Sequence, residues 1–338
     1  MKKIFLSTQI PDDKTAASKA KVDVLEILEN QGYHTVYFPP ITGVSSARKF
    51  WKTLSRLVVP GETHLILEYP CMPLKRISLV YLFCRMKKVK LYGVIHDIGA
   101  LRFGWPDQKD MLFLKMFDGL VSHNASMTAW LRQKGYKKKI VDLDVFDYCL
   151  ADAKNFHADS AGQPIKIFYA GNLAHKKAGY LYEKGMEKLD NVELCVYGQY
   201  FEQERLNGAA RINYKGVFNP NTPDLAENYH FGLIWEGSSL NTCDGLFGNY
   251  IRYNNPHKFS LYLSLGLPVI VWKEAAIAPF ILKNNIGFAI GSFHELEGIG
   301  KWITDDQYRT YTKNVESFAD KVRNGFFLKT ALNELIKP

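Results

Sequence analysis

The sequence predicts an α/β fold with two domains, each built on an open parallel sheet that helices cover on both faces. Strand-like apolar segments alternate with helical segments from residue 3 to residue 146, and the alternation resumes after the polar, turn-rich segment 150–164. Such alternation is typical of parallel sheets, because parallel neighbours need a crossover connection that is usually a helix. A length of 338 residues also suits two domains.

In the first half, the segment 89–95 is apolar apart from Lys90, as expected of a strand buried on both faces of a parallel sheet. The helical segment 14–31 ends at Gly32, and glycine often ends helices because it readily adopts the left-handed conformation. We expect strands at 3–7, 34–39, 63–70, 89–95, 119–123 and 139–146. We expect helices at 14–31, 46–58, 74–87 and 124–135.

The second half repeats this pattern after the polar segment. We expect strands at 165–171, 192–198, 211–217, 230–235, 267–272 and 286–290. We expect helices at 176–187, 222–229, 256–265, 275–284 and 292–300, and a long helical region at 303–336. The predicted domains are therefore 1–152 and 153–315, with a closing helix at 316–338.

Composition limits the classes of function. The chain carries 43 Lys and Arg against 34 Asp and Glu, a net charge of +9, and basic residues gather at 85–90 and 136–141. These clusters suit an anionic membrane or substrate, and the alternative is ordinary solvated lysines. The sequence carries no nucleic-acid-binding signature, so we expect no nucleic-acid partner. We expect peripheral association of the first domain with an anionic membrane surface.

The cysteines and the N-terminus indicate a cytoplasmic protein. The five cysteines are scattered and odd in number, without a Cys-x-x-Cys pair, so neither a disulfide framework nor a zinc site is expected. The N-terminal apolar stretch is too short for a signal peptide and soon meets Pro11, Asp12 and Asp13. No apolar run approaches the roughly 18 residues that span a bilayer.

Lys258 stands at the start of the predicted helix 256–265, in the stretch PHKFSLYLSLGLPV. A cation there is unfavourable unless an anion lies opposite, because a helix N-terminus already carries partial positive charge. The lysine and the free backbone N–H groups suit a diphosphate, with Asn255 and His257 beside them. The alternative is a surface lysine whose aliphatic stem covers apolar area.

The stretch YAGNLAHKK carries a second candidate for ligand binding. Open α/β sheets bind ligands at the carboxyl ends of their strands, and this turn follows the strand 165–171. Gly171 permits a ligand to approach the backbone closely, and Asn172, Lys176 and Lys177 follow it. The alternative is a tight turn followed by solvated lysines.

The loop EGSSLNTCD follows the strand 230–235 and should lie at the same edge of the sheet. Its carboxylates, Glu236 and Asp244, can accept hydrogen bonds from sugar hydroxyls. The alternative is a loop whose carboxylates are simply solvated.

His96 and Asp97 end the buried strand 89–95 of the first domain. Neither side chain is comfortable when fully buried and unpaired, and either can act as a general base toward a hydroxyl. Arg102 follows closely and can neutralise a carboxylate or contact an anionic acceptor. The alternative is a pair that stabilises the loop that follows.

The helix 256–265 and its flanks also match a known pattern. The spacing P-x-K-x(3)-Y-L-x(2)-G-x-P-V resembles the donor-nucleotide motif of two-domain bacterial glycosyltransferases with the GT-B architecture. Further segments resemble the β-1,6-galactofuranosyltransferases of bacterial O-antigen and capsule assembly, in order along nearly the whole chain: 94–102, 121–128, 145–148, 169–176 and 231–264. More distantly, the chain is similar to the glucosyltransferase that extends GlcNAc on streptococcal serine-rich adhesins.

The resemblance implies a GT-B fold, in which two Rossmann-like domains face a cleft and the C-terminal helix returns to the first domain. It implies that the second domain binds a UDP-sugar, with Lys177, or alternatively Lys176, meeting the diphosphate together with Lys258. Many GT-B enzymes carry a Glu three residues after this last lysine to hold the ribose. Here Leu261 stands in that place, so other groups must hold the ribose.

The implied reaction is inverting transfer of galactofuranose from UDP-galactofuranose to a hydroxyl of a lipid-linked cell-surface glycan, which gives a β linkage. Asp97 would be the base, with His96 orienting it or the sugar, or serving as base itself. GT-B enzymes generally need no metal, and we assign none to Asp142 and Asp144, which mimic an Asp-x-Asp motif within a strand-like run. The alternatives are a glucosyltransferase that uses UDP-glucose and a non-catalytic nucleotide- or carbohydrate-binding protein. The sequence leaves homo-oligomer formation open.

Overall fold

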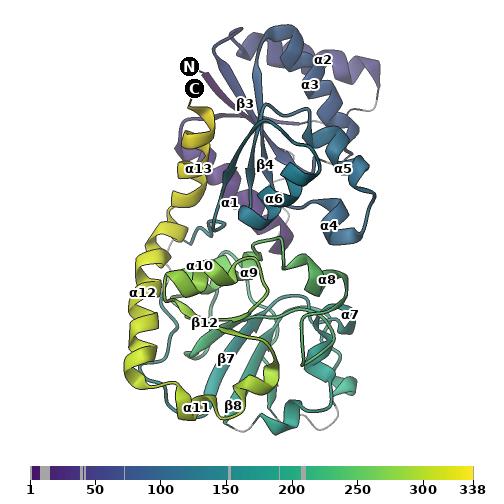
Figure 1. Cartoon of the computed structure of the whole chain (residues 1–338). Helices are drawn as coiled ribbons and strands as arrows, with labels where there is room; N and C mark the ends of the chain where they lie inside the picture. The colour runs from purple at the N-terminus through teal and green to yellow at the C-terminus, as the bar shows by residue number, and fades with distance from the viewer. Residues whose placement is uncertain are drawn as a thin grey trace. The chain divides into compact units, whose positions relative to one another are not determined.

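The computed structural model describes residues 2–7, 16–38, 41, 43–71, 73–150, 154–189, 191–206 and 211–337, with the backbone alone at 16–18 (Figure 1). The chain forms two compact units. The first comprises Met1–Leu143 and Gly325–Pro338, and the second comprises Asp144–Asn324.

The boundaries of these units differ from the predicted domain boundaries, which lay after residues 152 and 315. Backbone hydrogen bonds explain the first difference, since they join the segment after Leu143 to the second unit. The N–H of Tyr148 donates to the carbonyl of Val322, and the N–H of Phe156 donates to the carbonyl of Leu265. The polar segment 150–164 therefore lies within the second unit.

The first unit is built on a six-stranded parallel sheet with the order β2-β1-β3-β4-β5-β6. Its strands are β1 (Lys2–Ser7), β2 (His34–Tyr37), β3 (Thr63–Tyr69), β4 (Lys90–Ile95), β5 (Gly119–Ser122) and β6 (Lys139–Asp142). The central strands β3 and β4 are buried over almost their whole length, which follows from their nearly continuous apolar sequences. Each strand lies where the sequence predicts one.

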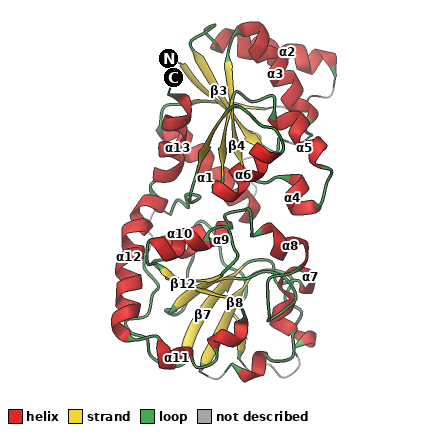
Figure 2. Ribbon diagram, in the orientation of Figure 1, coloured by secondary structure: helices red, strands yellow, loops and turns green. Residues whose placement is uncertain are grey.

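Helices flank this sheet (Figure 2). They are α1 (Ala16–Asn30), α2 (Val44–Leu57), α3 (Lys75–Lys87), α4 (Gly99–Phe103), α5 (Asp107–Leu114), α6 (Ala125–Gln133) and α13 (Phe326–Ile336). The C-terminal α13 packs on β5 and β6, and Lys139 Nζ donates to the carbonyls of Glu334 and Lys337 at 2.7 and 2.9 Å. The prediction that a C-terminal helix returns to the first domain is confirmed.

The second unit is built on another six-stranded parallel sheet, in the order β12-β11-β10-β7-β8-β9. Its strands are β7 (Ile165–Ala170), β8 (Val192–Tyr197), β9 (Ile212–Tyr214), β10 (Phe231–Ile234), β11 (Val269–Trp272) and β12 (Gly287–Ile290). Its α-helices are α7 (His175–Ala178), α8 (Gly245–Tyr250), α9 (His257–Ser264), α10 (Ala278–Lys283), α11 (Ile299–Trp302) and α12 (Asp305–Arg323). Short 3₁₀ turns lie at Gly179–Tyr182, Met186–Lys188, Gln203–Arg205 and Phe293–Leu296. The predicted strands are again confirmed.

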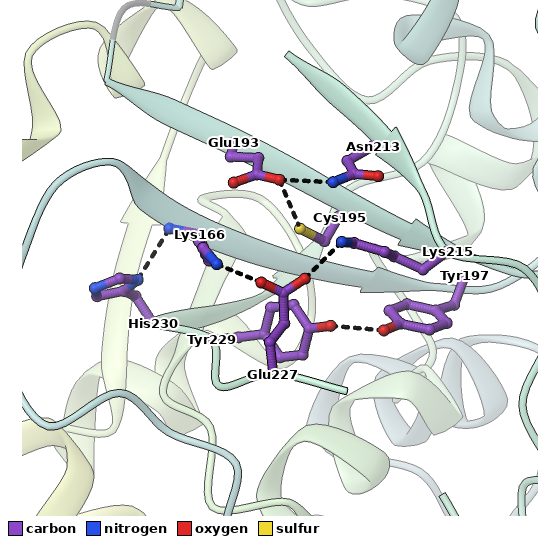
Figure 3. A network of polar contacts seen from close by, with 9 residues as sticks. All are labelled: Lys166, Glu193, Cys195, Tyr197, Asn213, Lys215, Glu227, Tyr229 and His230. Atoms are coloured by element: carbon purple, nitrogen blue, oxygen red, sulfur yellow. Dashed lines mark hydrogen bonds and ion pairs between the residues drawn. The ribbon is translucent and has the colours of Figure 1, made fainter. Parts of the chain in front are cut away.

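The predicted helix at 222–229 is wrong, because polar contacts hold this segment in an irregular path (Figure 3). Glu227 lies between Lys166 of β7 and Lys215, which directly follows β9, with an ion pair to Lys166 and another to Lys215 at 2.7 Å. The Tyr229 hydroxyl bonds that of Tyr197 at 2.6 Å. The network spans this side of the sheet, since Lys166 stands near the amino end of β7, whereas Tyr197 ends β8 and Lys215 directly follows β9.

Other helices are shorter or more numerous than predicted. The segment 176–187 forms α7 and two 3₁₀ turns, and the long region 303–336 breaks between α12 and α13 at Gly325, whose φ is +69°. The sequence analysis missed α4, α5 and α8, which are only five to eight residues long. Among the helices of the described ranges, none has both the length and the apolar character needed to cross a membrane.

Candidate functional site

Lys258 is buried at the start of α9, with its side chain 9% exposed. Its Nζ lies 2.7 Å from Oε1 of Glu236 and 3.9 Å from the centre of the Tyr169 ring. Burial lowers the pKa of Lys258, the Glu236 carboxylate opposes that shift, and the charge of Lys177 adds to it. The alternative of a solvated surface lysine is therefore wrong.

Glu236 follows β10 and is equally secluded, with its side chain 6% exposed. Its Oε1 bonds Lys258, while its Oε2 is buried and makes no hydrogen bond within the described residues. A buried carboxylate oxygen without a donor is costly, so this atom is suited to accept a hydrogen bond from a ligand. Glu236 is thus not the solvated loop carboxylate of the alternative interpretation.

Asp244 holds the shape of the 236–244 loop. Its Oδ1 accepts from the Ser238 N–H at 2.5 Å, and its Oδ2 accepts from the Ser238 hydroxyl at 2.8 Å. The backbone of Gly237 lies against this carboxylate and has a φ of +113°. A Cβ at this position would lie 2.3 Å from Asp244 Oδ1, so a side chain would clash there. Both carboxylate oxygens of Asp244 are therefore engaged within the loop itself.

The turn after β7 lies beside Lys258. A Cβ built on Gly171 would lie 3.4 Å from Lys258 Nζ, and one built on Gly198 would lie 1.7 Å from the Gly171 carbonyl oxygen. Gly198 therefore allows the segment after β8 to approach the Gly171 carbonyl, and Gly171 itself lies next to the lysine. Asn172 Oδ1 accepts from the Ala174 N–H at 3.0 Å and so shapes the turn.

The two lysines after this turn differ in their surroundings. Lys176 is exposed, whereas Lys177 is half-buried, with its Nζ 5.3 Å from the centre of the Phe247 ring. The Lys177 backbone carbonyl accepts from the Gly237 N–H at 2.9 Å, which ties this segment to the loop that follows β10. Gly171, Lys177, Glu236 and Lys258 therefore lie together at the carboxyl edge of the second sheet.

The polar residues that flank Lys258 hold the start of α9. Asn255 is buried, and its Nδ2 donates to the carbonyl of Asp144 at 2.8 Å. The ring of His257 packs on the ring of Tyr148, with 4.9 Å between their centres. These contacts give both residues a structural role in seating the helix that carries Lys258.

In the first unit, His96 directly follows β4 and pairs with a residue that the sequence analysis missed. Its Nε2 lies 2.8 Å from Oε1 of Glu68, whose side chain is fully buried within β3. The His96 N–H also donates to the Tyr69 carbonyl at 2.7 Å. The sequence feature that could have indicated Glu68 is that it is the single charged residue within the otherwise apolar stretch LILEY.

Asp97 and Arg102 form an ion pair, and both are partly exposed. His123, which follows β5, is buried behind His96, and burial together with the neighbouring His96 lowers the pKa of His123 to about 3. His123 is therefore neutral near pH 7. Arg102 neutralises a carboxylate, which is one of the two roles considered for it.

The two aspartates of the Asp-x-Asp sequence have different surroundings. The Asp142 carboxylate accepts from the Ser122 and Thr128 hydroxyls at 2.8 and 2.5 Å. Asp144 lies in the left-handed region with φ +65°, after the strand has ended. Asp142 thus ties β6 to β5 and α6.

Comparisons with known proteins agree with these features. The glucosyltransferase 3-like N-terminal domain matches residues 3–145, and the glucosyltransferase 3-like C-terminal domain matches residues 167–335. β-1,6-galactofuranosyltransferase WbbI of Escherichia coli K12 is 33% identical over 330 residues, which cover 96% of this chain and 95% of that protein. Glucosyltransferase 3 of Streptococcus parasanguinis is 27% identical over 74% of this chain and 73% of its own.

Solved structures show the same fold at low sequence identity. TarM of Staphylococcus aureus matches 86% of this chain with a TM-score of 0.54 and 14% identity, and the match spans 59% of the TarM chain. An α-glucosyltransferase solved with UDP and a 13-mer DNA matches 99% of both chains, with a TM-score of 0.52 and 9% identity. These neighbours have the GT-B fold, as predicted from the motifs. The chain therefore belongs to the glucosyltransferase 3-like family and is a glycosyltransferase with the GT-B fold.

Proposed function

We propose that this glycosyltransferase transfers galactofuranose from UDP-galactofuranose to a hydroxyl group of a lipid-linked cell-surface glycan. The 33% identity to a β-1,6-galactofuranosyltransferase over 96% of the chain supports the donor. The structural observation that carries the proposal is the buried Lys258–Glu236 pair beside the Gly171 turn. This arrangement supplies a cation for a diphosphate and an unsatisfied acceptor for a sugar hydroxyl.

The donor would bind at the carboxyl edge of the second sheet. Lys258, Lys177 and the N–H groups at the start of α9 would meet the diphosphate, and the Gly171 turn would allow its close approach. Glu236 Oε2 would accept a hydrogen bond from a hydroxyl of the transferred sugar, which would satisfy this buried oxygen. The two lysines would stabilise the leaving diphosphate, so the reaction would proceed without a metal ion.

The reaction would invert the anomeric centre in a single displacement. UDP-galactofuranose is α-linked, so attack by the acceptor hydroxyl from the opposite face gives a β product. A general base must accept the hydroxyl proton, and His96 and Asp97 are the candidates. Their contacts favour His96, because protonating Asp97 would sacrifice its ion pair with Arg102, whereas His96 is backed by the Glu68 carboxylate.

A lipid-linked acceptor would require approach to an anionic membrane, and α2 and α3 of the first unit suit this task. The two helices meet through Trp51 and Phe83, with 5.1 Å between the ring centres, and neither helix carries an acidic residue (Figure 1). Leu82 and Met86 are exposed on α3. Exposed basic side chains on or beside the two helices are Arg48, Lys49, Lys52, Arg56, Lys75, Arg85 and Lys88.

The second basic cluster contributes less to this surface than the sequence suggested. Lys138 Nζ donates to the carbonyls of Lys115 and Phe117 at 2.9 and 2.6 Å, and Lys139 Nζ donates to carbonyls at the end of α13. The membrane proposal therefore rests on α2 and α3, which we call the basic helix pair. Their charge suits the negative surface of the inner leaflet, where a peripheral cytoplasmic enzyme would meet its acceptor.

The alternative donor is UDP-glucose, which is favoured by the glucosyltransferase 3-like family models and by the relative from S. parasanguinis. A donor panel with the purified protein separates the two proposals. Initial rates with UDP-galactofuranose, UDP-galactopyranose and UDP-glucose identify the preferred sugar. Release of UDP without a glycan product would instead indicate that the acceptor is wrong.

A further inference from the structure

Lys258 and Glu236 are paired with each other, although the proposed donor site gives each of them a different part of the ligand. The Lys258 Nζ lies 2.7 Å from Glu236 Oε1, and solvent is nearly excluded from both side chains. The diphosphate of the donor needs the same ammonium that the carboxylate holds in this structure. Two anions, the Glu236 carboxylate and the diphosphate, therefore compete for one cation.

The two members of the pair differ in what else holds them. The Lys258 Nζ also lies 3.9 Å from the centre of the Tyr169 ring, a contact that stabilises its charge. The Glu236 carboxylate has only Lys258 as a hydrogen-bond partner within the described residues, because its Oε2 is buried and makes no hydrogen bond there. A ligand that takes Lys258 away therefore leaves a buried carboxylate unpaired, which is costly.

Sharing the ammonium does not remove this conflict. An ammonium has three N–H donors, so Lys258 could contact Glu236 and a phosphate oxygen together. Both anions would then lie within hydrogen-bond distance of one nitrogen, and so within about 6 Å of each other. Like charges repel far more strongly in a place that excludes water than in bulk solvent. Bare UDP therefore binds against the charge of Glu236, whether it shares Lys258 or displaces the carboxylate.

The sugar of an intact donor changes this balance. The sugar is bonded to the diphosphate, so its hydroxyls come close to the carboxylate that neighbours Lys258. A hydroxyl that donates to Glu236 Oε2 gives this buried oxygen the hydrogen bond that it lacks, and such bonds to an ionised acceptor are strong. UDP without the sugar offers no such hydroxyl and carries an additional negative charge on its terminal phosphate.

We propose that Glu236 makes the site selective for an intact UDP-sugar over bare UDP, and that it helps to expel UDP after transfer. This inference rests on the proposed function, in which the diphosphate binds Lys258. While the sugar is attached, its hydroxyl satisfies the Glu236 carboxylate. Once the sugar has passed to the acceptor, that hydroxyl leaves with it, and the carboxylate again opposes the diphosphate at Lys258. Glu236 thus speeds product release and weakens inhibition by UDP.

The decisive variant is Glu236→Gln, which keeps the shape and removes the charge, while the glutamine oxygen still accepts a hydrogen bond from Lys258. UDP should bind this variant at least about fivefold more tightly than the unmodified protein, the lower end of typical coupling between ligand groups. An intact UDP-sugar should gain less, because the glutamine oxygen is a weaker acceptor for its hydroxyl. Isothermal titration with UDP, UDP-galactofuranose and UDP-glucose measures these affinities.

Two controls address the charge and the fold. Glu193→Gln makes the same charge change near the amino end of β8 and should leave all three affinities unchanged. Urea denaturation shows whether each variant is folded at the temperature of the titrations. UDP should also be a stronger product inhibitor of Glu236→Gln than of the unmodified protein.

The unmodified protein supplies a second measurement that needs no variant. The methyl ester of UDP has the diphosphate charge of a UDP-sugar but lacks the sugar hydroxyls. The preferred UDP-sugar should therefore bind at least about fivefold more tightly than this ester. Equal binding of the two ligands would overturn the inference.

The outcomes also distinguish this inference from the proposed function. UDP affinity in folded Glu236→Gln that equals that of the unmodified protein, or falls below it, would overturn the opposition between Glu236 and UDP. The transferase proposal would then stand, because the unmodified protein still binds UDP. An unmodified protein that binds neither UDP nor any of the UDP-sugars would overturn the proposed function, and the role of Glu236 with it.

Discussion

Lys258 Nζ and Glu236 Oε1 form a 2.7 Å ion pair from which solvent is almost excluded. Lys258→Ala should therefore destabilise the protein by about 3–5 kcal/mol, because it leaves a buried carboxylate unpaired. The double variant Lys258→Met with Glu236→Gln removes both charges and should regain most of that loss. Urea denaturation of the three proteins measures the difference.

The same double variant tests the diphosphate site without a folding defect. Loss of one charge-assisted contact costs about 1.5–3 kcal/mol, so UDP affinity should fall roughly 10–150-fold. Isothermal titration with UDP measures this change. The control is Lys176→Ala, which replaces an exposed lysine and should lower UDP affinity least. Equal UDP affinity in the double variant and the unmodified protein would remove Lys258 from the site.

Transfer should continue in excess EDTA. Lys177 and Lys258 would supply the positive charge that a metal ion gives to a leaving diphosphate in other enzymes. The measurement is the initial rate of UDP release before and after exhaustive chelation. Activity that disappears with EDTA and returns with magnesium or manganese would contradict the metal-free mechanism.

The basic helix pair should bind anionic vesicles at low salt. Each basic residue near an anionic surface contributes about 1 kcal/mol, so Lys49→Glu with Lys52→Glu should abolish most flotation with phosphatidylserine vesicles. Lys301→Glu with Lys313→Glu makes the same charge change on exposed residues of the second unit and serves as the control. Flotation that survives the first pair of substitutions, or is lost equally with the second, would count against this surface.

His96→Asn should lower turnover by about 10²–10⁴-fold with little change in UDP affinity, as expected for loss of a general base. Asp97→Asn should lower turnover much less, because the Asp97 carboxylate forms an ion pair with Arg102. Single-turnover rates and UDP titrations on both variants make the comparison. A larger loss in Asp97→Asn than in His96→Asn would return the role of base to Asp97, as the motif alone suggested.

Glu227 should make the second unit sensitive to acid. Burial opposes ionisation of Glu227, but the hydrogen bonds from Lys166 and Lys215 outweigh it, so its pKa is lowered. A lowered folded-state pKa contributes stability above the unfolded value of about 4.3, and this stability is lost as pH falls through the folded value. Glu227→Gln should cost about 0.2–1 kcal/mol at pH 7 and almost nothing at pH 2. Urea denaturation at the two pH values measures the difference, and an equal cost at both would contradict the electrostatic role.

The two sheets could be predicted because each strand is marked by an apolar segment of the local sequence. Strands such as β4 are apolar after their first residue, Lys90, and the order of strands and helices then leaves few topologies. The helix predicted at 222–229 is absent because the helical spacing of this segment is weak. The charge of Glu227 is instead met by Lys166 of β7 and by Lys215, which directly follows β9. Contacts of this kind are set by tertiary packing and leave no pattern along the chain.

The positions of Gly171 after a strand and of Lys258 at a helix start were predictable, because the local sequence pattern indicates both. The pairing of Lys258 with Glu236, and of His96 with Glu68, depends on which strands are neighbours, so sequence spacing could not supply it. Asp244, Asn255 and His257, which the sequence analysis assigned to ligand binding, also contact protein groups of the second unit. Their contacts with a ligand stay a prediction.

The most direct test of the account is the ratio of kcat/KM for UDP-galactofuranose to that for UDP-glucose, measured with a synthetic glycan acceptor and followed by NMR of the product. The account predicts preference for UDP-galactofuranose by at least about tenfold, the ratio that 1.4 kcal/mol of transition-state discrimination gives, and a β-linked product. Preference for UDP-glucose, or an α-linked furanoside, would contradict it.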